Sequence, residues 1–257
     1  MPFPLESLEQ MQGFFWVLIR VSIILFLMPI FGAKGIPYMW KAGLSLIIAI
    51  ILTPVVPSPK IFPETTLEVI LGILSEVILG LIMVFVVKVL FASVQLAGQF
   101  MVFQMGFGMA RAMDPVTGVQ STALSQFLYL ITLLVFFALD GHHLFIRALA
   151  TTFYSVPPNS FSLNPSLSHV LIKTSSEMFL IALKIASPIM VALFLSNLCL
   201  GIVARTVPQM NILMVGFPVN ISLGLIIYGL ILRNLSPFLF DLTKRIGEVL
   251  SDVIHLM

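Results

Sequence analysis

The chain has 257 residues, of which 59% are hydrophobic and only 9% are charged, and its formal net charge is +2. A soluble domain carries about 25% charged residues, so this chain has too few charges to cover a water-exposed surface. The composition therefore excludes a disordered chain, a soluble enzyme and a nucleic-acid-binding protein, and it predicts an integral membrane protein. The single cysteine, Cys199, excludes an internal disulfide framework and is expected to be an inert thiol in an apolar run.

Six apolar stretches follow one another along the chain and predict an all-α, membrane-type fold. They are Gly13–Ala33, Ala42–Val56, Leu67–Leu90, Thr122–Leu139, Phe179–Ala204 and Ile212–Leu232. Crossing the hydrocarbon core as a helix takes about 20 apolar residues. Four of the stretches reach that length, whereas Ala42–Val56 is short and Thr122–Leu139 is marginal. We therefore expect about six long apolar helices.

The last segment, 236–257, changes to an amphipathic period. Charged residues fill most of one face, and apolar residues recur on the other at spacings of three and four: Leu239, Leu242, Ile246, Val249, Leu250 and Val253. This spacing predicts an amphipathic helix. The apolar face is expected to lie on the membrane surface or on a partner.

Two connectors differ in character. Ser155–Ser168 is rich in proline, asparagine and serine and predicts an exposed loop, with Asn164-Pro165 or Pro165-Ser166 opening the next helix. Phe91–Gln120 contains glutamines, methionines and four glycines, and it is neither very polar nor very apolar. Its composition predicts a connector that packs inside the protein or lines a cavity.

Several charged and polar residues interrupt the apolar stretches or flank their breaks: Arg20, Glu76, Lys88, Lys184, Asn197, Arg205, Asn211 and Asn220. An ionised group in hydrocarbon costs at least about 2.5–3.5 kcal/mol. The residues could form a transport path or proton relay, or they could make interhelical and intersubunit hydrogen bonds. We favour the second interpretation because the charges are scattered. Glu76 and Lys88 stand about 18 Å apart on one helix, so each needs a partner from elsewhere, which suggests an assembly.

No catalytic, metal or cofactor site is expected. His142 and His143 are adjacent, so their side chains should point in different directions, and a zinc site would need further ligands. Gly106-Phe107-Gly108 lacks the third glycine and the flanking strand of a dinucleotide-binding loop. The sequence also lacks a nucleophile elbow and a phosphate-binding loop, so an enzyme is not expected.

Four motifs in order resemble the FliR/SctT family of type III secretion export-gate subunits, and the likeness covers nearly the whole chain. Near the start stand Arg20, Pro29, Phe31 and Pro37. The central motif is Gly106-Phe107-Gly108-Met109-Ala110-Arg111-Ala112-Met113-Asp114-Pro115, followed by Thr117-Gly118-Val119-Gln120. The third is Asp140-Gly141-His142-His143 with Arg147 and Phe153, and the last is Ala204-Arg205-Thr206-Val207-Pro208-Gln209-Met210-Asn211 with Gly216-Phe217-Pro218. The Asp-Gly-His-His block favours the flagellar branch over the virulence branch.

The resemblance implies a structural and gating subunit of the flagellar protein export channel, at the basal body in the bacterial cytoplasmic membrane. Such a subunit would assemble with FliP-type and FliQ-type subunits into a closed helical ring around a protein-conducting pore. Other membrane proteins of the export apparatus and unfolded protein substrates would be further partners. No cofactor is implied. The family fold consists of helical hairpins, much of which is lifted out of the membrane plane, so the hydropathy count need not equal the number of membrane crossings.

The resemblance also divides the chain. Residues 1–175 would form a FliP-like part, and residues 176–257 would form a FliQ-like hairpin, with its turn at Arg205–Asn211, and the amphipathic C-terminal helix. The intramembrane polar residues Arg20, Glu76, Lys88, Arg205 and Asn211 are expected to hold the assembly together.

In the family, the segment around the central motif is a plug loop in the pore, which corresponds here to about 106–120. The physical chemistry agrees, because glycines permit sharp bends and methionines can seal an irregular gap and then yield. An ordinary packed loop is the alternative. The expected plug residues are Met105, Gly106, Phe107, Gly108, Met109, Arg111, Met113, Asp114 and Pro115.

Two other functions are left open. A virulence-type export-gate subunit would share the fold. An ion-coupled transporter of a small solute would use Arg20, Glu76 and Lys88, but such transporters show paired half-repeats with broken helices, and the sequence shows no such pairing.

Overall fold

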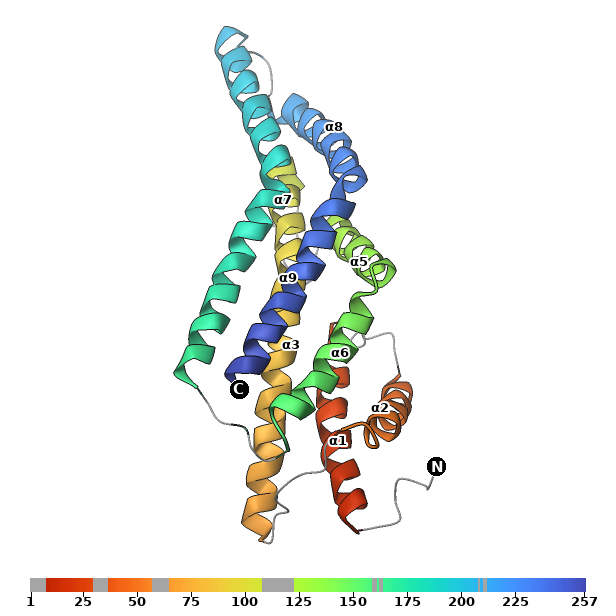
Figure 1. Ribbon diagram of the computed structural model, residues 1–257. Coiled ribbons are helices and arrows are strands. Elements are labelled where there is room, and N and C mark those ends of the chain that lie inside the picture. The colour runs from red at the N-terminus through yellow and green to blue at the C-terminus, as the bar shows by residue number, and fades with distance from the viewer. Residues whose placement is uncertain are drawn as a thin grey trace. The chain divides into compact units, whose positions relative to one another are not determined.

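The computed structural model describes residues 8–29, 37–56, 65–107, 123–158, 161, 164–207, 209 and 212–257. Within these ranges every regular element is a helix (Figure 1), so the predicted all-α fold is confirmed. The chain forms two compact units. The first comprises Met1–Leu90, Asp140–Thr174 and Thr243–Met257, and the second comprises Phe91–Leu139 and Ser175–Leu242.

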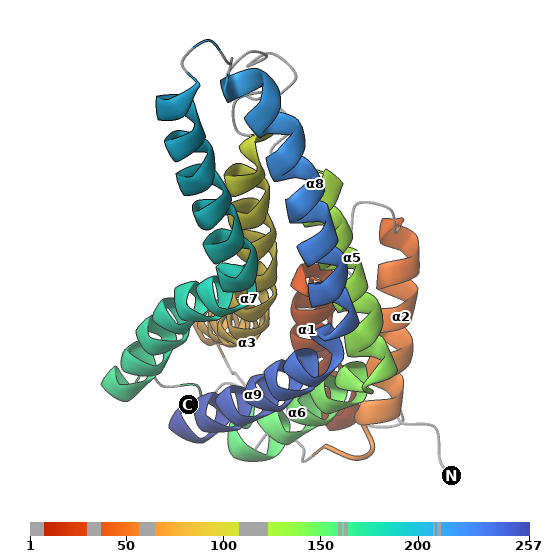
Figure 2. The same cartoon turned by 90° about the horizontal axis from the view of Figure 1, so that it is seen from above.

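The first unit contains α1 (Leu8–Leu27), α2 (Tyr38–Leu52), the first part of α3 (Thr66–Val102), α6 (Gly141–Ser155) and the end of α9 (Leu235–Leu256). Helices α1 and α2 lie side by side (Figures 1 and 2). Helices α1 and α3 approach closely at Gly80, where an added Cβ would lie 2.6 Å from Ile23 Cγ2. Tyr154 of α6 donates a hydrogen bond to the carbonyl oxygen of Val55 at 2.6 Å.

The second unit contains the end of α3, the π-helical segment η1 (Phe103–Phe107), α5 (Ala123–Ala138), most of α7 (Pro165–Thr206), and α8 (Ile212–Arg233). Phe91 of α3 packs edge-on against Tyr129 and Phe136 of α5, with ring centroids 6.1 and 5.2 Å apart. The Tyr228 hydroxyl of α8 donates to the carbonyl oxygen of Leu124 at 3.0 Å. Aromatic contacts and one interhelical hydrogen bond therefore connect α3 with α5 and α5 with α8.

Among the described residues, four helices are long and apolar enough to cross a membrane: Gln10–Leu27, Thr66–Phe107, Pro165–Thr206 and Met214–Arg233. They correspond to the four stretches that the sequence predicted to be long enough. Helices α5 and α6 are separated by a short break and would make a fifth span if counted together, whereas α2 is short, as expected. The break lies at Asp140, whose backbone has a φ of 57° in the left-handed region.

Two helices are longer than their apolar stretches. Helix α3 continues to Val102, so the prediction that a connector begins at Phe91 is wrong. Gly98 does not break the helix but lets α3 and α5 approach closely. An added Cβ at Gly98 would lie 2.8 Å from Ser125 Cα in α5. Helix α7 begins at Pro165, where the Asn164 side chain accepts a hydrogen bond from the Ser166 amide at 3.0 Å. The predicted helix start at Asn164-Pro165 is thus confirmed.

The predicted amphipathic C-terminal helix is present as α9 (Leu235–Leu256), and its entire predicted apolar stripe is buried. In the first unit, an added Cβ at Gly247 would lie 2.9 Å from Leu144 of α6. The expectation that this stripe lies on the membrane surface or on another protein is therefore wrong, because the chain itself covers it.

Candidate functional site

The start of the predicted plug loop is a sharp bend at the end of α3. The five-residue π-helical segment Phe103–Phe107 follows α3 directly, and within it Gly106 has φ 93° and ψ −1°. A residue with a side chain rarely adopts this backbone conformation, whereas glycine adopts it freely. Isolated π-helical turns are often found at functional sites. Gly106 thus ends the long helix immediately before the segment that resembles a plug.

The bend is anchored on α8. Phe107 packs edge-on against Phe217, with ring centroids 6.4 Å apart. Met105 is fully buried, and Gly224 leaves the space for it, since an added Cβ at Gly224 would lie 2.6 Å from Met105 Cγ. We call Met105, Gly106 and Phe107 with their α8 contacts Phe217 and Gly224 the plug root.

The rest of the predicted plug lies outside the residues that the structure describes. These residues are Gly108, Met109, Arg111, Met113, Asp114 and Pro115. The plug therefore stays a prediction, and the structure describes only the root from which it would extend.

A buried ion pair in the first unit is a second candidate site. The Arg20 guanidinium donates from Nε to Glu76 Oε2 at 2.5 Å and from Nη2 to Glu76 Oε1 at 2.7 Å. Its Nη1 donates to the Val156 carbonyl oxygen at 3.0 Å and to Thr152 Oγ1 at 3.3 Å, and its Cζ lies 4.3 Å from the Phe153 ring centroid. Both charged side chains are almost fully buried. This bidentate geometry is the strong form of an ion pair, and it ties α1, α3 and the C-terminal end of α6 together.

The sequence predicted that Glu76 needs a partner from another element, and that partner is Arg20 of the same chain. An interaction with a second subunit is thus not required to neutralise either charge. The Glu76 carboxylate is already neutralised by Arg20. It is therefore not free to bind an ion, as the alternative of an ion-coupled transporter would need.

The remaining predicted assembly residues differ from this pair. Lys88 is exposed and stands at the edge of an apolar groove on α3. Arg205 is exposed in the last turn of α7, and Asn211 lies outside the described residues. Of the four that the structure describes, it therefore brings together Arg20 and Glu76 alone.

Three further polar residues join α7 to α8 in the second unit. Ser196 donates to Asn220 Oδ1 at 2.9 Å, and Asn220 Nδ2 donates to Asn197 Oδ1 at 2.6 Å. These bonds account for the asparagines inside the last two apolar stretches, because amide side chains in an apolar environment pair across helices. They support α7 and α8 as a hairpin.

Asp140, His142 and His143 gather at the break between α5 and α6. The imidazole rings lie 4.1 Å apart, and His143 Nδ1 is 3.2 Å from Asp140 Oδ1. The prediction that the two histidines point apart is wrong, because residue spacing fixes the Cα–Cβ direction but not the rotamer that swings each ring. One ligand atom from each residue lies within 4.8 Å of the others, a set that could hold a metal ion.

Sequence reasoning missed three residues of these sites. Gly224 receives Met105, Thr152 accepts a hydrogen bond from Arg20, and Ser196 donates one to Asn220. None of the three stands in a motif. Each acts through its position on a helix face, and the importance of that position depends on which helix faces it. Phe153 and Phe217, by contrast, stand in the motifs that carried the resemblance.

Known proteins resemble this chain over most of its length. The chain matches bacterial export proteins, family 1, over residues 11–246. It is 32% identical to the flagellar biosynthetic protein FliR of Bacillus subtilis strain 168 over 222 residues, which cover 85% of each chain. It is 30% identical to the FliR protein of Pectobacterium carotovorum over 252 residues, or 97% of this chain and 95% of the relative. The FliR protein of Escherichia coli K12 is 29% identical over 249 residues, with the same two coverages.

The motifs, the all-α membrane-type fold and a family match over most of the chain agree with one another. The chain belongs to the FliR family of bacterial export proteins.

Proposed function

We propose that this membrane protein is the structural and gating subunit of the flagellar type III protein export channel. It acts in the bacterial cytoplasmic membrane at the flagellar basal body, together with FliP-type and FliQ-type subunits. The family match and the flagellar relatives support the export role. No observation favours the virulence-type or transporter alternatives.

The plug root carries the gating part of the proposal. A long apolar helix ends at Gly106 in a conformation that favours glycine, and the residues on either side are held on α8. A loop that begins from such an anchored bend has a fixed starting point and direction. Residues 106–120 then close the pore at rest and move aside when substrate passes, while the rest of the chain supports the ring.

The test compares export with assembly in Gly106 variants. Gly106→Val puts a β-branched residue at φ 93°, and its Cβ would lie 3.2 Å from the Phe217 ring, so we expect loss of motility and of secreted flagellin. Gly106→Asn should retain more export, because asparagine tolerates the left-handed region better than valine. Gly229→Val in α8 is the matched control, since nothing lies within 4 Å of its added Cβ.

The yield of the complex with FliP-type and FliQ-type subunits separates gating from folding. Normal export by Gly106→Val would contradict the gating role. Loss of the complex in that variant would instead make Gly106 a residue needed only for folding. A purified chain that never associates with those subunits would contradict the export-gate assignment itself.

A further inference from the structure

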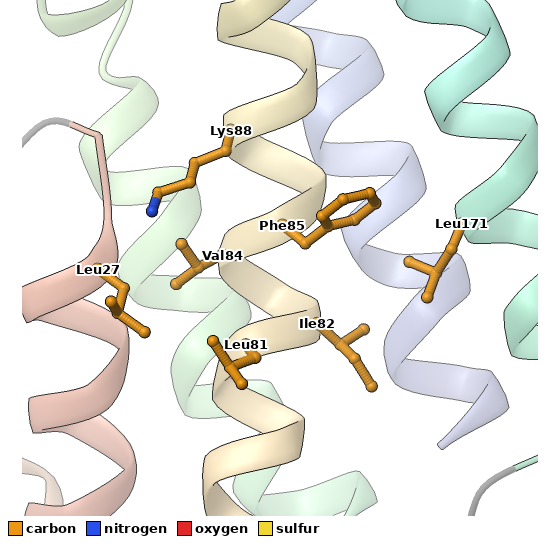
Figure 3. A pocket seen from close by; sticks show the side chains of 7 residues that line it. All are labelled: Leu27, Leu81, Ile82, Val84, Phe85, Lys88 and Leu171. Carbon is orange, nitrogen blue, oxygen red and sulfur yellow. The ribbon is translucent and has the colours of Figure 1, made fainter.

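An apolar groove lies on the first unit beside Lys88 (Figure 3). Its volume is about 360 Å³. Six of its seven lining side chains are aliphatic or aromatic, and the seventh is Lys88. The Lys88 side chain extends from α3 toward the side where Leu27 of α1 lies, above Leu81 and Val84 in the view of Figure 3. The groove thus combines a hydrocarbon-lined wall with one cation at its end.

Lys88 has no counter-ion in the part of the chain that the structure describes. No described carboxylate forms an ion pair with its amine, whereas the other charges on the apolar parts of α1 and α3, Arg20 and Glu76, neutralise each other. The side chain is also exposed. An anion from outside the described part of the chain would neutralise this lysine, because an unpaired charge beside hydrocarbon is costly.

The position of Lys88 along α3 indicates where that anion is found. Helix α3 begins at Thr66, and at about 1.5 Å per residue the 22 residues to Lys88 cover about 33 Å. The hydrocarbon core of a bilayer is about 30 Å thick, so the preceding stretch can span it and bring Lys88 to the headgroup level. With this stretch across the bilayer, Leu81, seven residues before Lys88, would lie about 10 Å deeper in the membrane. Hydrocarbon below and a cation above match the two ends of a phospholipid.

We propose that this groove binds an anionic phospholipid. The Lys88 ammonium pairs with the headgroup phosphate, and one acyl chain lies along Leu27 and Leu81. Selectivity for an anionic lipid follows from charge, because a zwitterionic headgroup brings its own cation to compete with Lys88 for the phosphate. The groove shares no residue with the plug root, so the lipid-binding proposal can be tested independently of the gating proposal.

Native mass spectrometry of the purified complex tests the site. The complex is titrated with phosphatidylglycerol and, separately, with phosphatidylcholine of the same acyl chains. We expect Lys88→Gln to weaken phosphatidylglycerol binding about fivefold, the effect of one basic residue near an anionic membrane surface. Lys88→Arg should retain the preference for phosphatidylglycerol. Lys244→Gln, which removes another exposed lysine, in α9, is the control and should change nothing.

A second variant tests the apolar half of the site without touching the charge. Leu81 is 49% exposed, so Leu81→Trp can fill the groove without disturbing the core, and it should weaken binding of both lipids. Equal phosphatidylglycerol binding by wild type, Lys88→Gln and Leu81→Trp would overturn the proposal. So would a Lys88→Gln complex that loses a neighbouring subunit while its lipid count stays the same, because the anion would then be a carboxylate of that subunit.

Discussion

Helices α3 and α8 are both apolar enough to cross a membrane, yet they use their apolar residues differently. In helix Thr66–Phe107, 61% of the most apolar window is buried by the chain itself, whereas in Met214–Arg233 the share is 17%. Most of the residues in this window of α3 are therefore buried against other parts of the same chain. Helix α8 leaves large side chains such as Met214 and Ile226 exposed, which suits contact with lipid or with neighbouring subunits. Mean hydropathy does not separate these roles, because it measures composition and not what surrounds the helix.

The polar residues show the same difference. Arg20 and Glu76 are buried inside the first unit, and each of the three guanidinium nitrogens of Arg20 donates a hydrogen bond. The Ser196, Asn220 and Asn197 contacts in the second unit are partly exposed and join only two helices. Variants in the first unit should therefore change the stability of the chain, and variants in the second should have smaller effects that concern export and assembly.

The largest effect is expected from Glu76→Ala. It leaves the Arg20 guanidinium buried without its carboxylate, which costs about 3–5 kcal/mol. The detergent-solubilised protein should melt at a much lower temperature and be recovered in lower yield. Glu248→Ala, which removes an exposed partner of Arg245, is the control and should melt like the wild type.

A double variant sharpens this first prediction. Replacing both charges, Arg20→Met with Glu76→Leu, should recover most of the lost stability, because no unpaired charge remains. If the double variant is as unstable as Glu76→Ala, packing around the two side chains, and not their charge, holds α1 against α3.

The next effect concerns the apolar stripe of α9. Ile246 is 1% exposed, so Ile246→Asp removes a packed side chain and buries a carboxyl group, at a cost of about 3 kcal/mol. Lys244→Ala alters only an exposed side chain and should be near neutral. Thermal unfolding of the chain purified without partners is the measurement. Stability that falls only in the assembled complex would show that α9 packs on another subunit after all.

A smaller effect is expected at the plug root from Gly224→Ala. The added methyl group would lie 2.6 Å from Met105 Cγ, and overpacking of this kind costs about 1–3 kcal/mol. Met105 should shift and loosen the start of the plug, which would be detected as leakage of small ions through the resting channel. Met105→Ala in the same chain should relieve the contact. Gly229→Ala is the matched control, because nothing lies within 4 Å of an added Cβ at this position on the same helix. An equal leak from the control would show that the leak does not arise from the contact with Met105.

The smallest effect is expected from Asn220→Leu. It removes the hydrogen bonds to Ser196 and Asn197, and interhelical bonds in membrane proteins contribute about 0.6 kcal/mol on average. The melting temperature should fall only slightly, and the exposed control Ser222→Ala should not change it. A fall as large as that of Glu76→Ala would mean that these amides are the main contacts that hold α7 against α8, although they are partly exposed.

The central motif shows how far sequence reasoning reached at the site. Gly106 was expected to bend the chain, and it does, because a φ of 93° is a property that glycine alone carries readily. The contacts of the plug root with Phe217 and Gly224 could not be predicted, since they join positions more than 100 residues apart through the faces of two helices. The division into a FliP-like part and a FliQ-like part stays a prediction.

The sequence by itself determined the membrane class, the helical fold, the four long spans, the helix start at Pro165 and the family, because composition, apolar length and local motifs are properties of neighbouring residues. Only the tertiary structure decided that α3 runs through Phe91–Val102, that Arg20 neutralises Glu76, and that the chain covers its own α9 stripe. Each of these depends on which distant surface faces a residue. A small residue can mark a break or a close helix contact, and a buried charge can find its partner in the same chain or in another. Local chemistry is the same in both cases, and only the position of the facing helix distinguishes them.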